Sequence, residues 1–537
     1  MTDPYPRPAM PETAPERWII RRTALGDVPT RAARRNPAAI ALVDGAERIS
    51  HGEFEAQANQ FAHHLLQSGL RPGDKVAMLA LNSIEFLVAT FGIFKAGMVW
   101  VPVNYMLGES DVRFVLEHAE AARVLIDTGL LQRDELRRAL EATGLPVLEL
   151  KPGRGADADT PLRQASAGMP DSPPDVDLRD QDLALIMYTS GTTGRQKGVM
   201  HSHASVHSAC MSNVAESKLD LHAVMSCALP LFHCAQFSGA VAALIAGACT
   251  VLLRGFDAGA FLDTLEQRRI THCSALPMMY GAMLAEQKRQ PRDLSALVQC
   301  SYGMAPMARP MLEQLVAHFC PSFSLGSGQT EVFPVTTRFR PEQQLQRFGS
   351  YWGTATLVND LAVMDGEGRL LPHGEIGEIV HRGPNVMIGY YKDPEATAAV
   401  SRFGWHHTGD IGRFDEDGQL LFLDRTKDLI KSGGENVPSI KVEEAFLRHP
   451  AVANAAAVGI AHPRWGEAVT VFVLLRDGAD ATEQALLEHG RAMLPGFEAP
   501  KEVRILQDFP MTPTGKIQKH KLRTQFAQLY AQPAHGG

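Results

Sequence analysis

The stretch Tyr188–Val199 reads YTSGTTGRQKGV and directly follows the apolar run Leu183–Met187, LALIM. Ser, Thr and Gly dominate it, and a lysine, Lys197, stands near its end. Glycines let successive backbone N–H groups turn inward around an anion, hydroxyls donate to phosphate oxygens, and the lysine adds positive charge. A strand followed by such a loop predicts a phosphate-binding site. Composition alone leaves a flexible Ser/Gly surface loop as the alternative.

The loop differs from the P-loop of kinases and ATPases. That motif requires GxxxxGK[ST], whereas here Lys197 is followed by Gly198 and Val199. The sequence therefore excludes P-loop phosphoryl transfer at this site.

Strand and helix patterns alternate around the loop. Residues 54–69 form an amphipathic pattern that ends at a glycine, and residues 84–97 form a second helical pattern. Short apolar strands are predicted over residues 75–81 and 98–103. Such alternation favours an α/β fold with a mainly parallel sheet covered by helices.

The 537-residue chain is too long for one ordinary core. Turns at Asp-Gly or Glu-Gly within residues 363–371 and 413–423 predict hairpins, and thus a β-rich subdomain after the α/β section. Beyond Asp424 the pattern becomes a short αβ unit. We expect a disordered lead-in (1–20), a large N-terminal α/β domain with parallel sheets plus the β-rich subdomain (21–425), and a small α+β C-terminal cap domain (426–537).

Composition narrows the functional classes. A net charge of −8 without long runs of one sign argues against a nucleic-acid or anionic-membrane surface. The longest apolar run, residues 240–253, is shorter than the roughly 18–20 residues of a membrane span and breaks at Gly247. The seven cysteines form no CxxC pair, which predicts buried reduced thiols. These features predict a cytoplasmic protein that is not an integral membrane protein.

Further motifs accompany the loop in a fixed order. They are PLFH (230–233), GSGQTE (326–331), WHHTGD (405–410), DRTKDLIKSGGENV (424–437) and PTGKIQK (513–519). Together with the loop they resemble the motifs of adenylate-forming, or AMP-binding, enzymes, which include acyl-CoA synthetases, aryl-CoA ligases, luciferases and peptide-synthetase adenylation domains. The resemblance runs from about residue 40 to residue 523.

The resemblance implies a two-step reaction. A carboxylate and ATP give an acyl-adenylate and pyrophosphate, and coenzyme A then displaces AMP. Like charges about 4 Å apart repel by about 4 kcal/mol at an effective dielectric of about 20, so the first step needs cations and oriented donors. The implied ATP or AMP contacts are Thr189, Ser190, Gly191, Thr192, Thr193, Gly194, Lys197, Gly326, Thr330, Asp410, Arg425, Lys427 and Lys431.

The resemblance also assigns roles within this set. Glu331 and Thr189 are the implied Mg²⁺ ligands, in keeping with the preference of hard cations for oxygen. Asp410 is expected to accept hydrogen bonds from both ribose hydroxyls, with Arg425 nearby. Thr330 is expected to contact the adenylate phosphate.

Two residues are implied as catalytic. Lys516, in PTGKIQK, is expected to neutralise charge between the carboxylate and the α-phosphate; a surface lysine is the alternative. His233 is expected to orient the carboxylate, with a structural histidine as the alternative. The family's cap domain rotates between the half-reactions, which implies a hinge at Lys427 and places Gly434 beside the pantetheine arm of coenzyme A.

The acyl pocket is expected around residues 232–238, 301–306 and 326–329, with Phe237 and Met304 as its acyl contacts. A core phenylalanine is the alternative for Phe237. These segments hold no basic residue except His233, which disfavours dicarboxylates and amino acids. The family often has an aromatic residue that stacks on adenine where this chain has Ser327, and Tyr302 is a candidate replacement.

The leading prediction is an acyl-CoA ligase for a medium- or long-chain fatty acid. An aryl-CoA ligase and a stand-alone adenylation enzyme that loads a carrier-protein thiol are the alternatives. A catalytically silent nucleotide-binding protein is disfavoured because Lys516, Glu331 and Asp410 are all present. The sequence does not fix the oligomeric state, and a homodimer is compatible with it.

Overall fold

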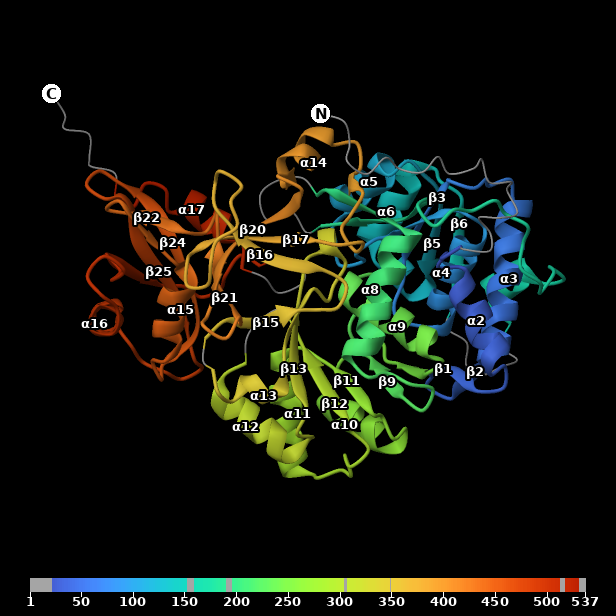
Figure 1. Ribbon diagram of the computed structural model, residues 1–537, viewed down its shortest axis with the longest axis horizontal. Helices are drawn as coiled ribbons and strands as arrows, with labels where there is room; N and C mark the ends of the chain where they lie inside the picture. Colours follow the sequence, from blue (N-terminus) through green and yellow to red (C-terminus); the bar gives the residue numbers. More distant parts are fainter. Residues whose placement is uncertain are drawn as a thin grey trace, which may run out of the picture.

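The computed structural model describes residues 22–151, 159–189, 196–303, 307–347, 349–511 and 517–530. Within these residues the strands form three sheets of fourteen, seven and five members. The two larger sheets and their helices make up the bulk of the molecule, and the smallest sheet lies to one side of them, at the left of Figure 1. The predicted lead-in, residues 1–20, falls outside the described residues.

The seven-stranded sheet follows from the strand–helix alternation of the first two hundred residues. Its central strands run parallel, as predicted, while β8 returns antiparallel to β7. In sheet order the strands are β18 (Gly389–Tyr390), β8 (Gly198–Ser202), β7 (Leu183–Tyr188), β4 (Val99–Pro102), β3 (Lys75–Leu79), β5 (Ala121–Asp127) and β6 (Val147–Leu150). The associated helices are α3 (His51–Gln67), α4 (Ile84–Lys95), α5 (Glu109–His118), α6 (Asp134–Thr143) and α7 (Pro161–Ser166).

The strand pairing of the fourteen-stranded sheet changes from mainly parallel to antiparallel across the sheet. Its first part is mainly parallel: β2 (Glu47–Ser50), β1 (Ile40–Asp44), β10 (Cys249–Leu252), β9 (Val224–Cys227), β11 (His272–Ser274), β12 (Gln299–Tyr302) and β13 (Phe323–Ser327). Its second part is antiparallel: β14 (Thr337–Phe339), β15 (Tyr351–Ala355), β21 (Leu420–Arg425), β20 (Trp405–Phe414), β17 (Gly377–Arg382) and β16 (Asp360–Met364), with β19 (Ser401–Arg402) beside β20. The α/β class with a β-rich subdomain is confirmed.

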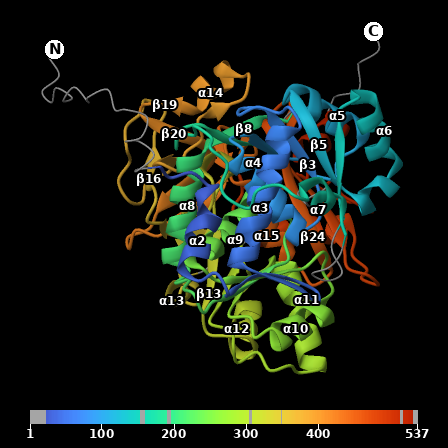
Figure 2. The same cartoon turned by 90° about the vertical axis from the view of Figure 1, so that its right-hand side faces the viewer.

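The helices of this part of the molecule are α2 (Asp27–Arg35), α8 (His203–Glu216), α9 (Cys234–Ala246), α10 (Ala258–Gln267), α11 (Pro277–Arg289), α12 (Arg309–His318), α13 (Pro341–Gln344) and α14 (Pro394–Val400). Helix α9 ends where Gly247 takes a φ of +80°, so the long apolar run divides into a helix and strand β10. In Figures 1 and 2 helices α8 and α9 lie next to each other, between the two larger sheets.

The five-stranded sheet belongs to the C-terminal part of the chain. It contains β22 (Ile430–Ser432), β23 (Glu435–Val437), β24 (Val452–His462), β25 (Gly466–Leu475) and β26 (Glu502–Ile505), with helices α15 (Ser439–Leu447), α16 (Glu483–Met493) and α17 (Lys519–Gln525). The change of sheet occurs between Arg425, the last residue of β21, and Ile430. The division at residues 425 and 426 stays a prediction, which this change of sheet supports.

Aromatic side chains fill the core between the sheets. Phe237, on α9, has no exposed surface, and its ring centroid lies 4.5 Å from that of Trp100 and 6.3 Å from that of Phe94. The prediction that Phe237 lines an acyl pocket is wrong, because its side chain packs into this core. Its neighbours on α9, Gln236 and Ser238, line the large cavity described below.

Phe237→Ala is expected to destabilise the protein by about 3–5 kcal/mol, because a fully buried ring leaves a cavity that the packed core fills only partly. Phe237→Leu should cost about 1 kcal/mol, since more of the volume remains. Denaturant unfolding measures both. A changed preference between short and long acids at wild-type stability would contradict the core assignment.

The seven cysteines are free thiols, and six of them are buried. This confirms the prediction that they are unpaired. Among the described residues no helix combines the length and the apolar character that crossing a bilayer requires.

Candidate active site

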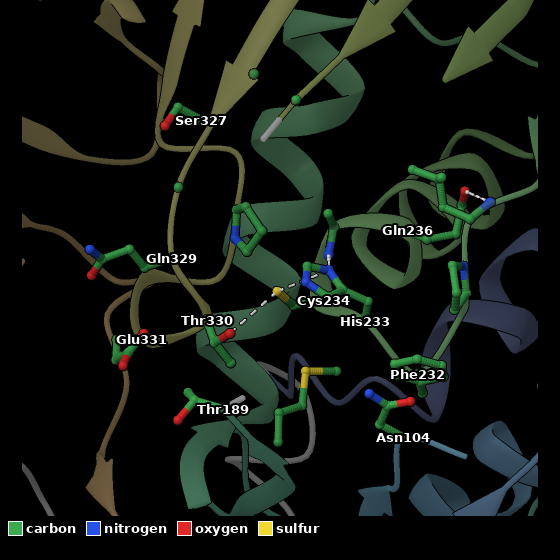
Figure 3. A pocket seen from close by; sticks show the side chains of 18 of the residues that line it. Asn104, Thr189, Phe232, His233, Cys234, Gln236, Ser327, Gln329, Thr330 and Glu331 are labelled. Carbon is green, nitrogen blue, oxygen red and sulfur yellow. Dashed lines mark hydrogen bonds between the residues drawn. The ribbon is translucent and has the colours of Figure 1, made fainter. Parts of the chain in front are cut away.

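One large cavity collects most of the predicted residues. Its volume is about 1960 Å³, well above the roughly 300–1,000 Å³ of an ordinary small-molecule site. Its walls come from β7, β13 and β20, from the N-terminus of α9, and from the C-terminal domain through Ile440, Glu443 and Gln518. Figure 3 shows Thr189, His233, Thr330 and Glu331 around one part of it. A space of this size fits more than one substrate.

Asp410 sits in this cavity with two fixed neighbours. The side chain is 2% exposed, and its Oδ2 accepts a 2.8 Å hydrogen bond from Gln329 Nε2. Arg425 Nε lies 3.3 Å from Oδ1, because Asp410 on β20 and Arg425 on β21 are paired in register. Gln329 also donates to the Thr408 carbonyl at 3.0 Å. The carboxylate is therefore oriented before any ligand arrives.

Sequence reasoning missed Gln329 as a partner of Asp410. The signal was present, since Gln329 belongs to the quoted GSGQTE motif, but its contact lies 81 residues away in the chain. Nothing local in the sequence pairs the two side chains.

The described residues at the two ends of the predicted phosphate loop belong to a hairpin at the cavity. Thr189 N donates to the Lys197 carbonyl at 3.0 Å, which closes the hairpin of β7 and β8. Thr189 and Lys197 both line the cavity. The remaining loop residues of the prediction lie outside the described residues: Ser190, Gly191, Thr192, Thr193 and Gly194.

Tyr390, which sequence reasoning did not identify, connects Lys197 with Glu331. The Lys197 Nζ lies 4.6 Å from the centre of the Tyr390 ring, and the Tyr390 hydroxyl donates to Glu331 Oε1 at 2.9 Å. Burial raises the pKa of Tyr390 well above its ordinary value, so the hydroxyl stays protonated and keeps donating. Lysine, tyrosine and glutamate thus form one connected group in the cavity wall.

Thr330 is held by a buried histidine. His201 Nε2 lies 2.7 Å from the Thr330 carbonyl, and burial lowers the pKa of His201 to about 4. The ring is therefore neutral at physiological pH, with Nε2 as the donor. The Thr330 hydroxyl lies 3.8 Å from Cys234 Sγ, the dashed contact in Figure 3. No sequence motif singled out His201.

His233 is the N-cap of α9 and lines the cavity. Its Nδ1 accepts a 3.3 Å hydrogen bond from the Ala235 backbone N–H. In the neutral ring the proton then sits on Nε2, which makes His233 a hydrogen-bond donor toward an acceptor such as a carboxylate. This geometry favours orienting a substrate over removing a proton.

The C-terminal domain presents one of its ends to the cavity. Gln518 lines the cavity, and its N–H donates to the Pro510 carbonyl at 2.7 Å, while Met511 and Ile517 form a β-bridge. Lys516 itself lies outside the described residues. Lys427 lines the cavity, and burial, aided by the charge of Arg425, lowers its pKa.

Two residues of this domain that were predicted to contact the nucleotide or coenzyme A lie away from the cavity. Lys431 and Gly434 are exposed and do not line the cavity. Lys431 does not reach the cavity in this arrangement, because β22 carries it on the exposed side of the small sheet, and its nucleotide contact stays a prediction. Gly434 has a φ of +90° and open space where a Cβ would lie, and the sequence placed it at the site only after a domain rotation.

One part of the cavity wall, which we call the inner branch, consists of Asn213, Ser217, Leu219, Met225, Gly239, Ala242, Ser274, Ser301, Gly326 and Arg338. The segments expected to form the acyl pocket hold no basic residue except His233, but folding brings Arg338 on β14 and the end of α8 to the cavity wall as well. Sequence reasoning considered only segments beside the motifs. Met304 lies outside the described residues.

Tyr302 is part of the cavity wall, and a hydrogen bond holds its hydroxyl group in place. It is 6% exposed, and its hydroxyl donates to Gln344 Oε1 at 2.7 Å. Both Tyr302 and Ser327 line the cavity. The suggestion that Tyr302 replaces the missing aromatic residue beside adenine stays a prediction.

The oxygen ligands at the site suit a magnesium ion that also binds the phosphates of the substrate. Among the residues described, no cluster of three or more His, Cys, Asp or Glu side chains could hold a metal by itself. Mg²⁺ commonly takes one or two carboxylates, keeps several waters and completes its shell with substrate phosphates. Glu331, with the Thr189 hydroxyl beside the phosphate loop, fits this pattern.

Comparisons with known proteins agree with this geometry. Residues 29–391 match the model of the family "AMP-binding enzyme", and residues 441–516 match "AMP-binding enzyme C-terminal domain". A feruloyl-CoA synthase of Amycolatopsis is 36% identical over 511 residues, covering 94% of this chain and 100% of that protein.

Solved structures of one protein, MatB from Rhodopseudomonas palustris, also match. The ATP-bound form has a TM-score of 0.84 at 30% identity, covering 94% of this chain and 99% of the other. The apo form has a TM-score of 0.75 at 30% identity, covering 95% and 100%. The chain belongs to the adenylate-forming, AMP-binding enzymes and is an AMP-forming acid–CoA ligase.

Proposed function

We propose that this protein joins an organic acid to coenzyme A in two steps within the large cavity. The carboxylate of the acid lies at His233 and the body of the acid extends into the inner branch, with ATP between the phosphate loop and Asp410. The observation that carries the proposal is that one cavity holds the Asp410 group, the Lys197–Tyr390–Glu331 group and His233. Fatty acids and aryl acids are both candidates, and the resemblance to a feruloyl-CoA synthase supports the aryl class.

In the first step a carboxylate oxygen attacks the α-phosphorus. The new bond joins that oxygen to phosphorus, the bond between the α-phosphorus and its bridging oxygen breaks, and pyrophosphate leaves. Asp410 accepts hydrogen bonds from the ribose, Thr330 and the loop donate to phosphate oxygens, and His233 Nε2 holds the carboxylate. Glu331 and Thr189 would hold a Mg²⁺ ion, which supplies neutralising charge at the phosphates.

In the second step the coenzyme A sulfur attacks the acyl carbon. The carbon–oxygen bond to the adenylate breaks, AMP leaves, and the thiol proton is released. The structure matches ATP-bound MatB better than apo MatB, with TM-scores of 0.84 and 0.75. This difference supports a placement of the C-terminal domain that suits the first step. Rotation of the C-terminal domain about the segment near Lys427 would then bring the exposed Gly434 to the site.

Pyrophosphate–ATP exchange tests this function. Purified protein with Mg²⁺ and a panel of fatty and aryl acids should exchange labelled pyrophosphate into ATP for at least one acid, and EDTA should abolish the exchange. Coenzyme A should then yield AMP and a thioester. No exchange with any acid would refute the function, and AMP release with carrier protein but not with coenzyme A would favour the carrier-loading alternative.

A further inference from the structure

A buried arginine stands in the wall of the inner branch. Arg338, on β14, is 5% exposed and lines the cavity. It lies opposite Gly326 in the antiparallel pairing of β13 and β14, and Gly326 also lines the cavity. Glycine places no side chain on the neighbouring strand at that position, and the Val335 side chain lies close to where its Cβ would be.

The partners of Arg338 are mostly neutral. Its Nη2 donates to Ser217 Oγ at 3.1 Å and its Nη1 to Ser324 Oγ at 3.2 Å. The side-chain oxygen of Gln299 lies 2.7 Å from Nη1 when its amide is turned to satisfy both neighbours. These oxygens hold the guanidinium in place without neutralising its charge.

The nearest carboxylate is shared with a second arginine. Glu216 Oε2 lies 3.9 Å from Arg338 Nε but 3.0 Å from Arg340 Nη2. Nε of Arg338 has no hydrogen-bond partner among the described residues. Burial lowers the pKa of Arg338 to about 10, so the group is still charged at neutral pH. A buried cation with so distant a counter-charge is stabilised when a ligand oxygen approaches it.

The rest of the inner branch is apolar with a polar end. Leu219, Met225 and Ala242 line one part. Near the arginine stand Ser217 and the hydroxyl pair of Ser274 and Ser301, whose oxygens are 2.6 Å apart. A plain alkyl chain would leave Arg338 Nε without a hydrogen-bond partner and these hydroxyls with only each other and the arginine, whereas an acid with an apolar body and an oxygen at its far end would offer them an acceptor.

We propose that Arg338 is a specificity-determining residue, which binds an oxygen substituent at the end of the acid remote from the reacting carboxylate. The inference rests on the proposed function and narrows its substrate to acids with such an oxygen, in the form of a hydroxyl, carbonyl or second carboxylate. It also replaces the expectation of a plain fatty acid.

Matched pairs of acids test the proposal. Phenylpropanoic acid with and without a para-hydroxyl, and octanoic acid with and without a terminal hydroxyl or carboxyl, are compared by kcat/KM for pyrophosphate release. The wild-type protein should prefer an oxygenated member of at least one pair by about 10- to 100-fold, and Arg338→Met should reduce that ratio about 10-fold or more. Arg338→Lys should retain part of it.

The control is Arg382→Met, since Arg382 is exposed on β17 and pairs with Asp360. It should leave the ratio as in the wild type. An equal loss for both members of each pair in Arg338→Met would assign Arg338 a purely structural role. A wild-type protein that turns over only the plain acids would refute the inference while upholding the ligase, whereas no turnover of any acid would refute the proposed function itself.

Discussion

Replacing Lys516 with alanine is expected to lower the rate of adenylate formation by about 100- to 1,000-fold, the range seen when one donor is removed from a developing negative charge. The residue belongs to the PTGKIQK motif, and its described neighbour Gln518 lines the cavity. A lysine that neutralises charge between the carboxylate and the α-phosphate contributes to the first step alone. Thioester formation from a supplied acyl-adenylate should therefore change only a few-fold.

The two half-reactions are measured separately. Pyrophosphate–ATP exchange reports the first, and AMP release from acyl-adenylate and coenzyme A reports the second. Arg476→Ala is the control, because this exposed cation of the C-terminal domain does not line the cavity. It should leave both steps near the wild-type rate. If Lys516→Ala lowered the rates of both half-reactions equally, the model in which the cap domain takes a different orientation in each step would be contradicted.

Asp410→Ala is expected to raise the KM for ATP by about 100-fold or more. Hydrogen bonds to a charged acceptor contribute about 1.5–3 kcal/mol each, and the substitution removes two of them. It also leaves Gln329 and Arg425 without the carboxylate that they contact at 2.8 and 3.3 Å. Exchange measured against ATP concentration, with the acid saturating, gives the KM.

An ATP analogue that lacks one ribose hydroxyl separates a binding role from a structural one. The wild-type protein should discriminate against the analogue, and Asp410→Ala should largely lose that discrimination. Asp360→Ala, at an exposed aspartate of β16 that pairs with Arg382, should behave like the wild type. If Asp410→Ala kept the full preference for ATP, the aspartate would not be the ribose acceptor.

The site depends on contacts that several elements supply jointly. Asp410 is oriented by a side chain from the GSGQTE motif, Glu331 by a tyrosine of β18, and Thr330 by a histidine of β8. Each supporting residue fixes a group that the motifs had already indicated. We therefore expect substitutions at Gln329, Tyr390 or His201 to disturb the site by loosening the groups that these residues contact.

Much of the architecture could be read from local patterns. The helix predicted over residues 84–97 is α4, Ile84–Lys95, and the strand predicted over residues 75–81 is β3, Lys75–Leu79. The hairpin expected within residues 413–423 joins β20 and β21. These elements were predictable because hydrophobic periodicity and turn residues act over a few positions of the chain.

The acyl side of the site could not be predicted in this way. Phe237 lies next to residues of the cavity wall, but the turn of α9 points it into the core against Trp100. Arg338 belongs to no motif, and it reaches the inner branch only because β14 pairs with β13 and α8 ends beside it. A helix turns successive side chains by a fixed angle, yet which face meets a cavity depends on the packing of whole elements.

By itself the sequence determined the alternation of strands and helices, the change to a β-rich section and the motif residues that we expect to bind a nucleotide and activate a carboxylate. Only the tertiary structure decided which side chains orient those groups and what the inner branch offers to the acid. The reason is chain distance: Gln329 and Asp410 are 81 residues apart, and Ser217 and Arg338 are 121 apart. Periodicity and motifs carry information over a few residues, whereas such pairs form only when the sheets assemble.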